Sequence, residues 1–127
     1  MSEQGGLIDT LGIEIETIRE DKVVVSLDVT ARHHQPAGFM HGGISLVLAE
    51  TAASIGADTS TDEDVNVFGM EINANHLKPF KTGRLRAVAE PLHRGNSTHV
   101  WEVNLLNNEE ERICRSRCTL SVRSGSQ

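Results

Sequence analysis

The sequence contains no apolar run approaching the ~20 residues that a membrane-spanning helix needs. Residues 1–10 also lack the charged and then apolar pattern of a secretory signal. Internal repeats, low-complexity tracts and long linkers are missing as well. These absences argue against a membrane protein and against several domains, and we expect a single cytoplasmic domain over residues 1–127.

Cysteine is scarce, and the spacing of the two that are present argues against a disulfide. Cys114 and Cys118 lie in a segment of strand character, where a four-residue separation places them roughly 13 Å apart on one face. That distance is too long for a disulfide bond, so we expect reduced core thiols, with a reactive pair of cysteines as the alternative. His33 and His34 are adjacent and do not readily chelate one ion together, so we expect an exposed turn there and no metal site.

Positive charge is in deficit, because the formal net charge of −6 reflects 12 Lys and Arg against 18 Asp and Glu. This deficit argues against nucleic-acid binding. It is uneven, however: residues 1–77 contain 3 basic and 13 acidic residues, whereas residues 78–127 contain 9 and 5. A local basic group suits a small ligand that carries phosphates, and a solvated strand face is the alternative. The group comprises Lys78, Lys81, Arg84, Arg86 and Arg94.

Segments in which apolar and polar residues alternate predict six strands, and one long apolar segment predicts a helix. We expect a helical turn over residues 7–11 and a loop over residues 30–40. The expected strands cover residues 13–19, 22–29, 65–77, 83–93, 98–107 and 112–123. From His41 or Gly42 to about Thr59 the sequence is helical and apolar nearly all round, which is typical of a buried helix. The pattern fits an α+β domain in which an antiparallel sheet wraps one central helix. One small sheet cannot cover such a helix on every side, which indicates a dimer.

Glu50 is the one carboxylate within the apolar part of this helix. Its neighbours three and four positions away include no basic residue: they are Leu46, Val47, Ala53 and Ser54. A carboxylate on a buried helix without a counter-charge commonly has a specific task. The alternative is that Glu50 begins a narrow polar stripe with Thr51, Ser54 and Asp58.

Two glycines follow His41 at the expected start of the helix. Backbone N–H groups at a helix N-terminus stabilise negative oxygen, so Gly42 and Gly43 are oxyanion-hole candidates, although glycine pairs also occur where elements simply pack closely. Gly42 and Glu50 are eight residues apart, roughly 12 Å along a helix axis. If both act on one carbonyl group, Gly42 of one subunit must face Glu50 of another.

Several motifs together resemble the hotdog-fold acyl-CoA thioesterases. They are Gln35-Pro-Ala-Gly-Phe-Met-His-Gly-Gly, the following Leu-Ala-Glu-Thr-Ala-Ala-Ser, Gly69-Met-Glu-Ile-Asn-Ala-Asn-His76, Gly83-Arg-Leu-Arg-Ala-Val-Ala and Pro91-Leu-His-Arg-Gly95. The resemblance covers residues 11–122. It is greatest to the branch of phenylacetate-pathway thioesterases, Arthrobacter-type 4-hydroxybenzoyl-CoA thioesterases and 1,4-dihydroxy-2-naphthoyl-CoA hydrolases.

The resemblance implies hydrolysis of an aromatic or medium-chain acyl-CoA to the free acid and coenzyme A, without a metal or organic cofactor. Glu50 resembles the catalytic carboxylate, acting as nucleophile or general base, and Gly42 the oxyanion amide. Gln35 and His41 resemble the residues that orient or polarise the thioester carbonyl. Ser54 is similar to the hydroxyl that positions the attacking water.

The same resemblance implies where coenzyme A binds and how subunits assemble. The substrate-binding positions would be Gly69, His76, Lys78, Arg94, Gly95, Asn96 and Ser97. A homotetramer built from two dimers is the expected assembly. Two other functions remain open at this point: a non-catalytic acyl-CoA-binding module of the same fold, and a hotdog hydratase or dehydratase.

Overall fold

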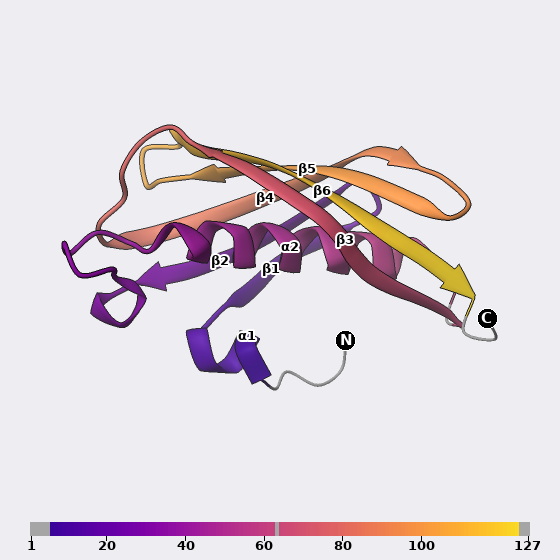
Figure 1. The fold of residues 1–127 in the computed structure, drawn as a ribbon, viewed down its shortest axis with the longest axis horizontal. Helices are drawn as coiled ribbons and strands as arrows, with labels where there is room; N and C mark the ends of the chain where they lie inside the picture. The colour runs from indigo at the N-terminus through magenta and orange to yellow at the C-terminus, as the bar shows by residue number, and fades with distance from the viewer. Residues whose placement is uncertain (1–5, 63, 125–127) are drawn as a thin grey trace.

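The computed structural model describes residues 6–62 and 64–124, which form a six-stranded sheet and one long helix (Figure 1). The helical elements are α1 (Gly6–Leu11), the short 3-10 helix η1 (Ala31–His33) and α2 (Gly42–Thr59). The strands are β1 (Glu14–Arg19), β2 (Lys22–Val29), β3 (Val65–His76), β4 (Gly83–Arg94), β5 (Thr98–Leu106) and β6 (Arg112–Ser124). The predicted elements are all present, with bounds that differ by at most one residue.

The strands lie in the order β1-β2-β4-β5-β6-β3, and every neighbouring pair is antiparallel. Figure 1 shows α2 running along one face of this sheet. The α+β architecture predicted from the sequence, a sheet around one central helix, is therefore confirmed. The strand β3 enters the sheet next to β6, which leaves its other side at an edge.

The core lies between α2 and the sheet. Alternate side chains of β2, β4, β5 and β6 point toward the helix, and Trp101 is the largest fully buried side chain. Its indole ring packs on Gly56 so closely that a Cβ atom at this position would overlap three ring carbons. On α2 the buried residues include Leu48 and Ala52, whereas Val47 is half-buried and Glu50 is exposed. A single chain thus covers only one side of the helix.

A histidine holds α1 in place against the rest of the chain. The backbone N–H of Thr30 donates to His33 Nδ1 at 2.9 Å, so the neutral ring carries its proton on Nε2 and donates it to the Leu11 carbonyl at 3.0 Å. Arg32 Nη2 donates to the same carbonyl at 3.0 Å. The expectation of an exposed turn was wrong for His33, which is only 2% exposed. Its burial comes from this contact with a residue 22 positions earlier.

The edge strand β3 presents large apolar side chains to solvent. Phe68 is 64% exposed and Met70 is 60% exposed, and the ladder to β6 shifts register between Gly69 and Glu71. An unpaired edge with exposed apolar side chains favours pairing with another strand.

No helix among the described residues is long and apolar enough to cross a bilayer.

Candidate active site

The N-terminus of α2 presents an unused backbone donor. His41 is the N-cap residue, and its Nδ1 accepts a hydrogen bond from the Gly43 N–H at 2.8 Å. The Ile44 N–H donates to the His41 carbonyl at 3.0 Å. The Gly42 N–H, in contrast, has no acceptor among residues 6–62 and 64–124. This is the group that can stabilise an oxyanion, because the positive end of the helix dipole lies there too.

His76, at the end of β3, lies over Gly42. A Cβ atom on Gly42 would be 3.1 Å from His76 Nε2, tighter than an ordinary contact, so a side chain here would displace the imidazole by a few tenths of an ångström. The two residues share a cavity of about 270 Å³ with three other polar side chains, those of Gln35, Ser45 and Lys78. Four of the predicted site residues, Gln35, Gly42, His76 and Lys78, are thus brought together.

Glu50 and Ser54 line a second cavity, of about 310 Å³. They are one helical turn apart on α2, so both side chains reach the same space. The other lining residues are mostly apolar: Leu7, Ile8, Val47, Thr51 and Ile55. Behind Glu50 its carboxylate contacts Gly69 at the position a Cβ atom would take. Gly69, expected to bind substrate, therefore provides space for Glu50 in this chain.

The two cavities share no lining residue, although both lie along α2. Gly42 and Glu50 are at positions that the helix itself keeps roughly 12 Å apart. A single described chain therefore does not place the oxyanion amide and the carboxylate on one carbonyl group, as the spacing in the sequence predicts.

The remaining predicted coenzyme A residues lie at the β4–β5 turn. Arg94, Gly95, Asn96 and Ser97 line a cavity of about 600 Å³ together with Val65, the first residue of β3. The length of β3 separates this cavity from His76 by roughly 36 Å. Within one chain, the two predicted groups of coenzyme A residues are therefore far apart.

The turn is held by short-range contacts around Trp101. The Arg94 guanidinium lies 5.6 Å from the centroid of the indole ring and donates to the Glu20 carbonyl. Trp101 Nε1 donates to His99 Nδ1 at 3.3 Å. Burial lowers the pKa of His99, and the charges of Arg94 and His93 lower it further. His99 is therefore neutral and serves as the acceptor for the indole.

Most of the predicted basic group is paired with carboxylates. Lys78 Nζ lies 2.9 Å from Glu111 Oε2. Arg84 is surrounded by three acids, Glu14, Glu16 and Asp28, and its pKa is raised, chiefly by the hydrogen bond with Glu14. Arg86 lies 2.9 Å from Glu110 Oε2. Arg84 and Arg86 thus stabilise the sheet surface, and Arg94 is the better candidate for a phosphate partner.

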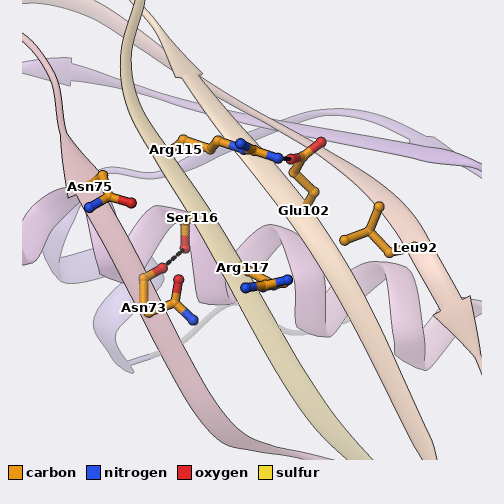
Figure 2. Close-up of a pocket in the computed structure, with 7 residues that line it drawn as sticks. All are labelled: Asn73, Asn75, Leu92, Glu102, Arg115, Ser116 and Arg117. Carbon is orange, nitrogen blue, oxygen red and sulfur yellow. Dashed lines mark hydrogen bonds and ion pairs between the residues drawn. The ribbon is translucent and has the colours of Figure 1, made fainter.

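A further cavity, of about 260 Å³, lies on the outer side of the sheet (Figure 2). Figure 2 shows α2 behind the strands that carry the side chains lining this cavity, and the Arg115 side chain is turned toward Glu102. Ser116 Oγ donates to the Asn73 carbonyl at 2.8 Å. None of the predicted site residues lines this cavity, so it is not a candidate for the thioester chemistry.

Both cysteines are buried and unreactive by their surroundings. Burial raises the pKa of Cys118 to about 12, with smaller contributions from the negative charges of Glu50 and Glu71. Burial also raises the pKa of Cys114. The reduced core thiols predicted from the sequence are confirmed.

Within the described ranges, no three His, Cys, Asp or Glu side chains are gathered to hold a metal ion.

The sequence did not single out Leu7 and Ile8, although they line the Glu50 cavity. The helical turn that carries them was predicted, but its position beside α2 was not. Contacts between segments that are distant in the sequence leave no periodic pattern. The apolar residues on the exposed side of α2 were the available signal for such a cavity.

Comparison with known proteins adds independent information. A family model described as the thioesterase superfamily matches residues 37–114. A 1,4-dihydroxy-2-naphthoyl-CoA hydrolase from Listeria monocytogenes is 52% identical over 118 residues, which cover 93% of this chain and 96% of the relative.

Solved structures agree with the sequence relatives. A thioesterase from Haemophilus influenzae superposes with a TM-score of 0.90 at 38% identity, covering 94% of this chain and 84% of the other. A Staphylococcus aureus protein carrying a Glu-to-Ala substitution superposes with a TM-score of 0.91 at 39% identity, over 94% and 99% of the two chains. The same Staphylococcus aureus protein, described as a thioesterase enzyme, is also known with a Gln-to-Ala substitution, at a TM-score of 0.89 and 39% identity over 92% and 98% of the chains.

Proposed function

Because the chain belongs to the thioesterase superfamily and is a thioester hydrolase, we propose that its substrate is 1,4-dihydroxy-2-naphthoyl-CoA or a similar hydroxylated aromatic acyl-CoA. The name of the Listeria relative, which matches nearly the whole chain, supports the acyl group. The observation that supports the proposed site is that Glu50 and Ser54 line one apolar cavity, while Gly42, whose N–H has no acceptor among the described residues, lines another.

In the proposed mechanism the Gly42 N–H binds the thioester oxygen, where negative charge develops as the carbonyl carbon is attacked. Gln35, which lines the same cavity as Gly42, and His41, the N-cap residue of α2, orient the carbonyl. Glu50 then acts in one of two ways. It removes a proton from a water held by Ser54, and this water attacks, or it attacks directly and forms an anhydride that water hydrolyses. In both routes the C–S bond breaks, and coenzyme A leaves as a thiolate that takes up a proton.

The engineered forms of the Staphylococcus aureus thioesterase support this choice of residues. The substituted Glu and Gln lie fifteen positions apart in that protein, and Gln35 and Glu50 have the same separation here. Because those two structures match nearly the whole of this chain, the substituted Gln and Glu support Gln35 and Glu50 as the corresponding residues here.

The two halves of the site come together if two chains pair through the free edge of β3. An antiparallel pairing that brings His76 of one protomer opposite Gly69 of its partner is centred between Ile72 and Asn73. It would place the Gly42 amide beside the Glu50 carboxylate of the other chain, because His76 lies on Gly42 and Gly69 lies on Glu50. Such a contact also covers Phe68 and Met70. A dimer of dimers stays a prediction.

The test is release of coenzyme A, followed with a thiol-trapping reagent, by wild type and by the Glu50→Gln variant. Cys114 and Cys118 are buried and give little background signal. Benzoyl-, hydroxynaphthoyl-, phenylacetyl- and straight-chain acyl-CoA are compared. We expect kcat/KM for the hydroxynaphthoyl ester to be highest and to fall by about a hundredfold or more in Glu50→Gln.

Two outcomes would contradict the proposal. Equal turnover by wild type and a folded Glu50→Gln variant would remove Glu50 from the chemistry. Binding of acyl-CoA by wild type without release of thiol would instead identify a non-catalytic binding module.

A further inference from the structure

We propose that Leu7 of α1 is a specificity-determining residue, which forms a fixed wall of the acyl pocket beside Glu50 and selects acyl groups by their width. This inference rests on the proposed function, because it assigns the acyl group to the cavity at Glu50. Leu7 lies outside the central helix and outside the motifs that carry the family resemblance.

The composition of the cavity indicates what it binds. Leu7 and Ile8 come from α1, and Val47 and Ile55 come from α2, so two helices supply apolar side chains from separate parts of the chain. Glu50 is the only charged residue among the lining side chains. Its carboxylate is beside apolar walls, which suits a ligand with an apolar body attached to the reacting carbonyl group.

The hydroxyl groups of Thr51 and Ser54 complete the lining of the cavity. Thr51 Oγ1 donates its proton to the Val47 carbonyl at 2.7 Å, so its oxygen has only acceptor capacity left for a ligand. A hydroxyl on the acyl ring can donate to that oxygen. The arrangement favours a hydroxylated aromatic acyl group over a plain aliphatic chain of similar size.

Leu7 is positioned to limit the width of the pocket without stabilising the fold. Its side chain is 54% exposed, and α1 has no buried residue among those described. Substitution at Leu7 therefore removes or adds volume at the cavity and leaves the core between α2 and the sheet unchanged. Ile8, which packs against the core, lacks this property.

The wall does not adjust freely, because the far end of α1 is anchored. The Leu11 carbonyl accepts from both Arg32 and His33, and the Gly12 N–H donates to the Ile8 carbonyl at 3.0 Å. Gly12 adopts a φ of 83°, the left-handed conformation that ends a helix and favours glycine. A wall fixed in this way discriminates by size, since a wider acyl group cannot displace it cheaply.

The experiment compares Leu7→Ala and Leu7→Trp with wild type and with a matched control, Leu92→Ala. Leu92 is the same residue type and 56% exposed, but it lies at the cavity on the outer side of the sheet (Figure 2). For each protein kcat/KM is measured with hydroxynaphthoyl-CoA and benzoyl-CoA, and the ratio of the two values is the readout. Chain association is followed by sedimentation.

We expect Leu7→Trp to lower the naphthoyl-to-benzoyl ratio by roughly tenfold or more, the range in which pocket volume discriminates substrates. Leu7→Ala shifts the ratio the other way, toward the wider acyl group. Leu92→Ala leaves the ratio at the wild-type value.

An unchanged ratio in both Leu7 variants would overturn the inference, as would an equal loss for both substrates accompanied by a smaller assembly. The second result would make Leu7 an interface residue. These failures are separate from failure of the proposed function, which appears as a wild-type protein that hydrolyses neither ester.

Discussion

The carboxylate of Glu50 fills the space where a side chain at Gly69 would begin. Gly69 lies at the register shift of the edge strand β3, so an irregularity of the sheet and the Glu50 carboxylate of the central helix are matched to each other. The glycine is needed there for its small size and has no unusual φ angle.

The Gly69→Ala variant is predicted to fold but to lose activity. The added methyl group must displace the Glu50 side chain, because the backbone of β3 is held by its ladder to β6. A shift of about 1 Å in a catalytic group can lower kcat by about a hundredfold. Steady-state kinetics check this, and circular dichroism confirms the fold. Leu92→Ala, at the cavity on the outer side of the sheet, is the control and should retain full activity; full activity in Gly69→Ala would contradict the assignment.

Mixing two inactive variants tests whether the site is shared between chains. Glu50→Gln and Gln35→Ala are each expected to be inactive alone. If Gln35 and Glu50 of different chains form one site, a mixed dimer contains one intact site and one doubly defective site. Unfolding and refolding an equal mixture should then restore about a quarter of wild-type activity, by random pairing in a two-fold dimer. Sites confined to one chain would give no recovery at all.

The contact between Trp101 and Gly56 predicts a loss of stability on a single methyl insertion. Gly56→Ala forces the indole out of its place, because the added Cβ atom would overlap three ring carbons, so the free energy of unfolding should fall by roughly 1–3 kcal/mol. Urea titration followed by circular dichroism measures it, since Trp101 is the one tryptophan of the chain and is itself replaced in the next variant. Adding Trp101→Phe, which shortens the opposing ring, should reduce the penalty of the alanine; two strictly additive penalties would argue that the residues do not clash.

The neutral state of His99 predicts a pH dependence of stability. Its pKa in the folded chain lies below the unfolded value of 6.5, because of burial first and then Arg94 and His93. The unfolded chain therefore binds more protons in the acid range, and stability is full above pH 6.5 and declines as the pH falls below it. Protonation also removes the acceptor for Trp101 Nε1.

Comparison with His99→Gln isolates this effect from the titration of the carboxylates. The difference in Tm between wild type and the variant should be largest near pH 8 and should shrink toward pH 5, since glutamine does not titrate. A difference in Tm that stays constant over this range would show that His99 does not couple protonation to folding.

The elements of the fold were predictable because their signals are local. Alternation in β2 and β6 and the apolar helix α2 fix the strand and helix bounds to within one residue. The position of β3 at the edge beside β6 was not predictable, since antiparallel partners 38 to 59 residues apart leave no mark in either segment alone. That placement decides which strand is free to pair.

The candidate site shows the same division. Residues within one turn of each other, such as Glu50 and Ser54, were correctly expected to reach the same space, because helix geometry relates them. Contacts across the chain were missed: His33 with Leu11, and Leu7 with the Glu50 cavity. The separation of Gly42 from Glu50 was an exception, since the rigid rise of a helix sets distances over several turns.

The division of Gly42 and Glu50 between two cavities has a consequence for duplicated genes. If two chains share the site as proposed, one copy can lose Glu50 and the other Gln35 after a duplication without loss of the whole enzyme, because the mixed pair keeps one complete site. Each product would then depend on the other, and selection would retain two subunits where one had been enough. Complementary loss of half-sites, rather than new chemistry, would in this way turn a homodimer into an obligate heterodimer.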